Sequence, residues 1–214
     1  MSPSARFLVV LDVDSTLIEQ EVIELIAAVA GVEEEVARIT ERAMRGELDF
    51  SASLRSRVAL LRDVPLSELA AIGERLRLTA GAQELIDAVH AADGRIAAVS
   101  GGFHEVLDPL AERIGLDRWR ANRLEVREGL LTGALRGPVI GRTAKLETLR
   151  EWTEAEGLPI QRTVAIGDGA NDLGMMSAAG LSVAFAAKPI VRAQASVSMP
   201  ERDLRQVLPL LGLA

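Results

Sequence analysis

The sequence predicts an α/β protein with a doubly wound, mostly parallel sheet and an inserted helical cap. Short aliphatic runs alternate with segments of helical periodicity, which is typical of parallel strands joined by crossover helices. One long block after the first strand candidate has helical patterns only. The chain has 214 residues, of which 49% are hydrophobic, enough for one α/β core and a small appended unit. We therefore expect a core formed by residues 1–17 and 78–214 and a cap formed by residues 18–77.

The core elements follow from local patterns. Leu85, Ile86 and Val89 form an apolar stripe that predicts a helix over residues 81–92, and residues 142–156 show similar spacing. Two short runs around Arg127-Glu128-Gly129 predict a small β-hairpin flap. The four predicted parallel strands are residues 7–11, 95–100, 163–166 and 181–184.

The cap is predicted from four helix-like segments that follow the first strand. Gly31, Gly46 and Pro65 separate them, as glycine and proline commonly do at helix ends. An insertion at this point of a doubly wound core lies over the strand ends and acts as a lid. The four segments are residues 21–30, 33–45, 50–61 and 67–76.

Composition excludes several classes of function. The chain has no cysteine, so disulfides and thiolate zinc sites are excluded and any metal site must be rich in oxygen ligands. A net charge of −7 argues against a nucleic-acid partner. Residues 1–6 carry no apolar leader, and no apolar run is long enough to span a bilayer. We expect a soluble, cytoplasmic protein without a membrane partner, either a monomer or a homodimer.

The strongest chemical signal is Asp12-Val13-Asp14-Ser15-Thr16, directly after the first strand. Ligands of open α/β sheets bind beyond the carboxyl ends of the strands, so both carboxylates are expected in that crevice. One can serve as nucleophile and metal ligand while the other moves a proton. Taken alone, however, such a pair could equally cap the following helix.

A second acidic segment, Gly167-Asp168-Gly169-Ala170-Asn171-Asp172, follows the third predicted strand. Asn, Asp and Gly also form ordinary turns, but two acidic strand ends in one chain make that reading weaker. Together with Asp12 and Asp14, Asp168 and Asp172 form a cluster of hard oxygen ligands suited to Mg²⁺.

Two further segments become candidates for the same site because the two acidic motifs are present. Ser100, Gly101 and Gly102 end the second strand before a helix, where a hydroxyl and backbone amides can bind an oxyanion. An N-cap serine with a glycine turn would look the same. Lys145 lies near the start of the helix over residues 142–156, and only its combination with the other motifs distinguishes it from a surface lysine.

These motifs, in this order, resemble those of the haloacid dehalogenase superfamily, and within it the phosphoserine phosphatases. The likeness covers essentially the whole chain and no catalytic position departs from it. It is carried by Asp-Ser-Thr at 14–16, Ser-Gly-Gly-Phe at 100–103, Ala-Asn-Arg at 121–123 and Gly-Asp-Gly-Ala-Asn-Asp at 167–172.

The resemblance implies roles for these residues. Asp12 would attack phosphorus, and Asp14 would act as acid and then base. Mg²⁺ would be held by Asp12, Asp168 and the backbone carbonyl of Asp14. Asp172 would orient Lys145. The phosphoryl group would be bound by Ser100, Gly101, Gly102, Lys145 and Asn171.

The resemblance also implies a substrate. Glu21 would bind its ammonium group and Arg57 its carboxylate, with Met44 and Phe50 as apolar contacts. The implied reaction is hydrolysis of phosphoserine to serine and phosphate, the last step of serine biosynthesis. Two alternatives remain: a phosphatase or phosphotransferase acting on another small amino acid phosphate such as phosphohomoserine, and a catalytically silent binding domain. The two cap residues also have competing interpretations. Glu21 could be an acidic residue in the first turn of a helix, and Arg57 could lie on a solvated helix face.

Overall fold

The computed structural model describes residues 5–213, apart from the side chain of Met44. Its centre is a seven-stranded sheet in the order β4-β3-β2-β1-β5-β6-β7. Every neighbouring pair is parallel except β3 and β4. The predicted doubly wound, mostly parallel sheet is thus confirmed. Its strands are β1 (Leu8–Leu11), β2 (Arg95–Phe103), β3 (Arg118–Arg127), β4 (Leu130–Arg136), β5 (Thr163–Gly167), β6 (Leu181–Phe185) and β7 (Val197–Met199).

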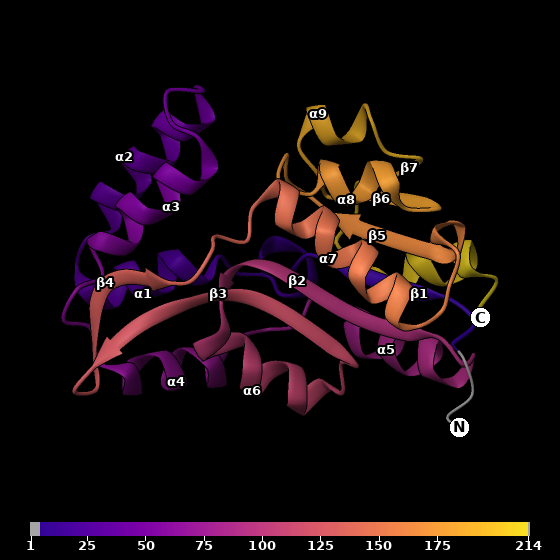
Figure 1. Cartoon of the computed structure of the whole chain (residues 1–214), viewed down its shortest axis with the longest axis horizontal. Helices are drawn as coiled ribbons and strands as arrows, with labels where there is room; N and C mark the ends of the chain where they lie inside the picture. Colours follow the sequence, from indigo (N-terminus) through magenta and orange to yellow (C-terminus); the bar gives the residue numbers. More distant parts are fainter. Residues whose placement is uncertain (1–4, 214) are drawn as a thin grey trace.

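Helices cover both faces of this sheet (Figure 1). Because side chains alternate along a strand, β1 sends Val9 and Leu11 into one apolar cluster and Leu8 and Val10 into another. The first cluster is closed by α5 (Ala82–Ala91) and α6 (His104–Ile114), and the second by α7 (Arg142–Ala155), α8 (Leu173–Ala178) and α9 (Pro189–Arg192). Burial on both faces explains why β1 is a continuous apolar run.

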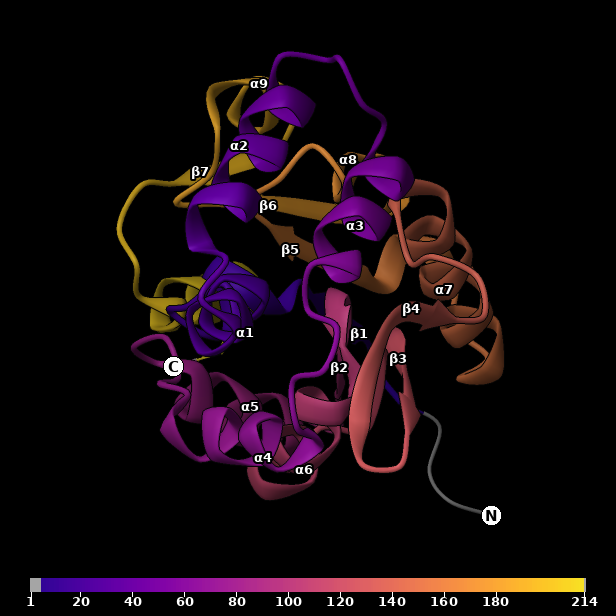
Figure 2. The same ribbon diagram turned by 90° about the vertical axis from the view of Figure 1, so that its left-hand side faces the viewer.

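All four helices of the predicted cap are present: α1 (Val22–Ala30), α2 (Glu33–Met44), α3 (Phe50–Ala59) and α4 (Leu66–Arg75). α2 and α3 project together at one end of the sheet, and Figure 2 views the molecule from this end. α4 lies alongside α6 instead, packed against the core layer. The helices therefore agree with the prediction, whereas the boundaries of a separate cap at residues 18 and 77 stay a prediction.

The predicted hairpin is present but longer than expected. Its turn is formed by Glu128 (φ 50°) and Gly129 (φ 79°), both left-handed, as a two-residue hairpin turn of type I′ requires. The segment between α3 and α4 pairs with it: the Asp63 N–H donates to the Leu131 carbonyl at 2.9 Å, and the Leu131 N–H to the Val64 carbonyl at 2.9 Å. The hairpin thereby ties the cap segment to the sheet.

Several short elements were not predicted. β7 has three residues, and the first part of β3 has no clear alternation of polar and apolar side chains. Helical turns also occur at Val13–Leu17, Ile160–Arg162 and Leu204–Leu211. Elements this short depend on packing more than on their own sequence. Among residues 5–213, no helix combines the length and apolar character that crossing a bilayer requires.

Candidate active site

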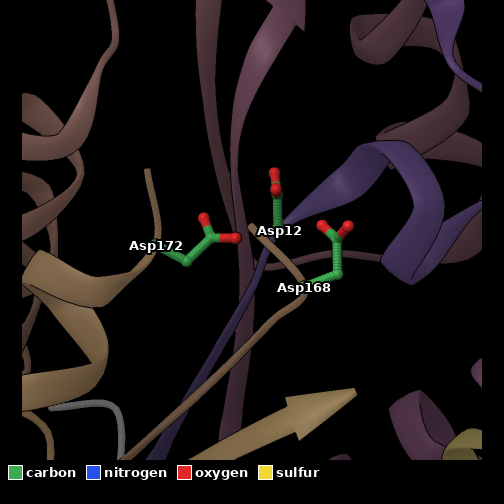
Figure 3. Close-up of side chains that lie close together, drawn as sticks. All are labelled: Asp12, Asp168 and Asp172. Atoms are coloured by element: carbon green, nitrogen blue, oxygen red, sulfur yellow. The ribbon is translucent and has the colours of Figure 1, made fainter. Parts of the chain in front are cut away.

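Three carboxylates converge at the carboxyl edge of the sheet (Figure 3). β1 and β5 are neighbours, with Leu11 paired to Ile166, so the residues that follow them reach the same edge. Oxygen atoms of Asp12, Asp168 and Asp172 all lie within 4.8 Å of one another. The two acidic motifs, far apart in the sequence, thus form one cluster.

Lys145 supplies a positive charge to this cluster from the first turn of α7. Its Nζ lies 2.6 Å from Oδ1 of Asp12 and 2.7 Å from Oδ1 of Asp172, and its side chain is fully buried. Burial by itself would lower the pKa of Lys145, but the carboxylates of Asp12 and Asp172 outweigh it and raise that pKa above the usual range. The lysine is therefore held charged against Asp12.

The turn after β5 is shaped around Asp172. Oδ2 of Asp172 accepts a hydrogen bond from the Gly169 N–H at 3.0 Å, while Oδ1 holds Lys145. A Cβ atom on Gly167 would lie 2.5 Å from that same Oδ2, and one on Gly169 would overlap the Asn171 amide. Gly167 is needed because the Asp172 side chain folds back over the turn, and Gly169 because the Asn171 amide lies against it.

Asp168 is the carboxylate without a partner. Among the described residues, no group donates a hydrogen bond to its side chain and no cation pairs with it. Partial burial, with the negative charge of Asp12, raises the pKa of Asp168 to about 6. Two neighbouring carboxylates, one unpaired, form a hard-oxygen donor set that a divalent cation would neutralise. The residues present therefore fit a divalent metal ion.

Asp14 lies in a different environment from Asp12. Its Oδ1 accepts from the Val22 N–H at 3.0 Å, and its Oδ2 lies 3.5 Å from Oγ of Ser100. Burial, followed by the charge of Glu21, raises the pKa of Asp14 to about 8. At neutral pH this carboxyl can hold a proton. The 4.8 Å cluster found among the described residues does not include the Asp14 carboxylate, which leaves its carbonyl for the metal role that the resemblance implies.

Ser100 is buried at the end of β2, and its Oγ accepts from the Gly102 N–H at 2.7 Å. A Cβ atom on Gly102 would lie 2.8 Å from Oδ2 of Asp14, so a glycine is required there. The Phe50 ring of α3 lies over the same segment, with its Cζ 3.0 Å from a Cβ built on Gly101. The segment was expected to end the strand, but β2 continues through it to Phe103 as an irregular stretch, and Phe50 of α3 packs against it.

Glu21 and Arg57 come from the cap segment, Glu21 just before α1 and Arg57 in α3. Glu21 precedes α1 and accepts from Oγ of Ser15 at 2.7 Å; burial is the main cause of its raised pKa. Arg57 is partly buried, and burial lowers its pKa against the opposing charges of Glu21, Glu24 and Asp14. Within the described residues Arg57 has no ion pair, and its Nε donates only to the Ser53 carbonyl at 3.4 Å. The side chain of Met44 lies outside the described residues.

Three residues of this region were not singled out from the sequence. Ser15 has a left-handed backbone (φ 57°), and Arg202 near the C-terminus donates to its carbonyl at 3.1 Å. A serine at positive φ gives no signal in the sequence, and neither does an arginine 187 residues away. Asn122 is buried and bonded to backbone groups. The only sequence signal for Asn122 was the Ala-Asn-Arg segment at 121–123, and the sequence alone assigned no role to it.

The model of the haloacid dehalogenase-like hydrolases matches residues 9–177 of this chain. The chain belongs to this family. A phosphoserine phosphatase of Streptococcus thermophilus is 48% identical over 95% of this chain and 95% of its own length. Some relatives are longer: the chain matches 51% of the length of the phosphoserine phosphatase of Streptomyces coelicolor, at 51% identity over 98% of the chain.

Solved structures of this haloacid dehalogenase-like family agree with the fold. A structure described as a phospho-aspartyl intermediate analogue of phosphoserine phosphatase has a TM-score of 0.90 and 43% identity, covering 98% of this chain and 100% of that one. A substrate-bound phosphoserine phosphatase complex has a TM-score of 0.91 and 42% identity, covering 99% and 100%. The resemblance predicted from the sequence is confirmed.

Proposed function

We propose that the cleft hydrolyses phosphoserine to serine and inorganic phosphate through an aspartyl phosphate on Asp12. The proposal rests on the different environments of two carboxyl groups in the same turn, those of Asp12 and Asp14. Asp12 is held 2.6 Å from the ammonium of Lys145, whereas burial raises the pKa of Asp14 to about 8. One group is placed as a nucleophile and the other as a proton donor.

In the first step, a carboxylate oxygen of Asp12 forms a bond to phosphorus while the bond from phosphorus to the serine oxygen breaks. Asp14 gives its proton to the leaving oxygen, so serine departs as a neutral alcohol. In the second step, Asp14 accepts a proton from water, whose oxygen attacks phosphorus and releases Asp12. The cycle ends with phosphate free and Asp14 protonated again.

Binding of the phosphoryl group falls to the residues around the two turns. Lys145 and Ser100 are the charged and hydroxyl donors, and backbone amides of Gly101 and Gly102 and the side chain of Asn171 complete the set. Donors fixed in advance lower the barrier because they need no reorganisation as charge moves onto the phosphoryl oxygens. Asp172 positions Lys145 through the 2.7 Å ion pair.

Members of this family generally use a divalent metal ion, and the Asp12, Asp168 and Asp172 cluster can hold one. We propose Mg²⁺, held by Asp12, Asp168 and the carbonyl of Asp14. When bound it would neutralise the carboxylates that face the phosphate. Asp172 is committed to Lys145 and to the Gly169 N–H, and this favours a supporting role over direct coordination.

The cap supports an amino acid substrate. Glu21 offers a carboxylate to an ammonium group, and Arg57, without an ion pair in the described chain, offers a guanidinium to a carboxylate. Phe50, together with Met44, would cover the carbon chain. Residues 18–77 would then act as a lid, and a cytoplasmic location is proposed with this function.

A panel of phosphorylated metabolites assayed with Mg²⁺ tests the proposal. Phosphoserine should have the highest kcat/KM, ahead of phosphohomoserine, whose chain is one methylene longer, and far ahead of phosphate esters that carry no amino acid. One extra or missing methylene group in a hydrophobic binding pocket changes kcat/KM by about 10- to 200-fold. A preference for phosphohomoserine would transfer the assignment to the alternative substrate, and absence of any hydrolysis would refute phosphatase activity.

A further inference from the structure

The pairing of β2 with β3 is interrupted at the active site. Ala97, Ala98 and Val99 pair in regular parallel register with β3, and the register then shifts before Phe103 meets Asn122. Four steps along β2, from residue 99 to 103, face two steps along β3, from 120 to 122. Between these paired positions β2 therefore has two residues more than β3, and they belong to the Ser100–Gly102 segment. A bulge of this kind removes backbone groups from the ladder, so they need other partners.

The side chain of Asn122 supplies those partners. Its Nδ2 donates to the carbonyl of Gly101 at 2.8 Å and to that of Gly102 at 3.3 Å. Its Oδ1 accepts from the N–H of Ile140 at 2.8 Å. Asn122 is only 3% exposed, so both ends of the amide are used where no bulk water could replace them.

These hydrogen bonds join two parts of the phosphate site. A Cβ atom on Gly102 would lie 2.8 Å from Oδ2 of Asp14, and the Gly102 N–H donates to Oγ of Ser100. Ile140 immediately precedes Gly141, whose carbonyl accepts from the N–H of Lys145 at 2.9 Å, in the first turn of α7. The hydrogen bonds of the Asn122 side chain go to backbone groups and not to the reacting carboxylates.

We propose that Asn122 is a positioning residue that fixes the distance between Ser100 and Lys145 by tying the bulge of β2 to the start of α7. This inference deepens the proposed function and rests on it, because both residues are the phosphoryl-binding donors named above. Such donors act only when they are held in the geometry of the transition state, and a displacement of about 1 Å costs about 100-fold in rate.

The Asn122→Asp variant tests this role with almost no change of shape. It keeps an oxygen for the Ile140 N–H but removes both hydrogens that reach Gly101 and Gly102. Ser182→Ala is the matched control: Ser182 is buried and accepts from the Ser196 N–H at 2.9 Å, at the start of β6. There it lies at the opposite end of the sheet from the catalytic cluster. Chemical unfolding of both variants measures the structural cost of each loss.

The measurements are kcat and KM for phosphoserine and the dissociation constant of orthovanadate, a phosphoryl mimic, in the full chain with Mg²⁺. We expect Asn122→Asp to lose about 100-fold in kcat. Its affinity for orthovanadate should fall as well, while Ser182→Ala matches the wild type in both. Restoring the amide in the revertant must restore both values.

Two outcomes overturn the proposal. One is a wild-type kcat and vanadate affinity in Asn122→Asp. The other is an equal loss in Ser182→Ala, which would reduce the effect to general stability. If the unmodified protein fails to hydrolyse phosphoserine, the proposed function is refuted. The vanadate titration then still decides whether Asn122 positions an oxyanion site.

Discussion

At the scale of single residues, two aspartates one residue apart acquire different chemistry from their surroundings. Asp12 follows a buried strand and lies against Lys145, whereas Asp14 turns toward the Val22 N–H and the cap. Burial without a nearby cation raises the pKa of a carboxyl, and a close ammonium stabilises its charge. The left-handed Ser15, which follows Asp14 in the same motif, marks the turn of the backbone at this point.

Replacing Asp12 with asparagine should abolish turnover without unfolding the protein. The amide keeps the shape of the side chain but cannot form the aspartyl phosphate, so kcat should fall by a factor on the order of 10⁴ or more. Lys145 keeps Asp172 as its buried partner, so the thermal midpoint should change little. Asp87→Asn, on the exposed side of α5, is the control and should be fully active. Normal turnover in Asp12→Asn would rule out this nucleophile.

Removal of divalent metal should abolish activity, and added Mg²⁺ should restore it. Ca²⁺ should inhibit, because it accepts more ligands at longer distances and so loosens the alignment of Asp12 with phosphorus. Asp168→Asn should weaken Mg²⁺ binding, measured by calorimetry, since it removes the unpaired carboxylate of the cluster. Full activity in excess chelator, or unchanged Mg²⁺ affinity in Asp168→Asn, would contradict the proposed metal site.

At the scale of elements, the cap is held by backbone pairing as well as by apolar packing. Residues 63–66 add to the β3–β4 hairpin through three N–H to carbonyl bonds of 2.8 to 2.9 Å. α3 then runs close above β4: a Cβ atom on Gly133 would lie 3.0 Å from the Ala59 carbonyl oxygen. The hairpin is thus the structural link between the sheet and α3, which carries Phe50 and Arg57.

Gly133→Ala should destabilise the protein more than Gly137→Ala does. Both glycines are left-handed, with φ of 79° and 85°, so each substitution carries the same backbone penalty of about 1–2 kcal/mol. Only Gly133 approaches another backbone segment, whereas the space around Gly137 is open. The crowding against α3 should add about 1 kcal/mol or more in chemical unfolding. Equal losses in the two variants would mean that α3 moves aside freely.

Elements with their own periodicity were predictable from the sequence, and elements that depend on neighbours were not. The cap helices were predicted within a few residues because the four segments have helical patterns and Gly31, Gly46 and Pro65 separate them. β7 and the first half of β3 form because an adjacent strand offers a ladder, which no local pattern records. The motif residues could be found, but not the side-chain contacts of Asn122 and Arg202, which depend on the folded chain.

At the scale of the whole molecule, an acidic protein binds an anionic substrate by concentrating positive charge in one cleft. The net charge is −7, yet Lys145 is fully buried within hydrogen-bond distance of Asp12 and Asp172, and Arg57 of α3 lies in the field of Glu21, Glu24 and Asp14. A bound divalent cation would add to these two. Charged groups from both parts of the chain therefore lie near the acidic motifs, and we expect substrate specificity to depend on how the cap segment closes over them.

Arg57→Ala and Glu21→Gln should change the choice of substrate more than the chemistry. If Arg57 binds the substrate carboxylate inside the closed cleft, its loss should cost phosphoserine about 2–5 kcal/mol in kcat/KM, because the partner charge stays buried and unpaired. Phosphoethanolamine has no carboxylate and never used that contact, so its slow hydrolysis should be unchanged. By the same reasoning, Glu21→Gln should spare phosphate esters that lack the ammonium group.

Arg55→Ala, which replaces an exposed arginine of the same helix, is the control. A parallel fall for both substrates in Arg57→Ala would make Arg57 a residue of cap closure, and amino acid specificity would have to come from other groups in the cleft.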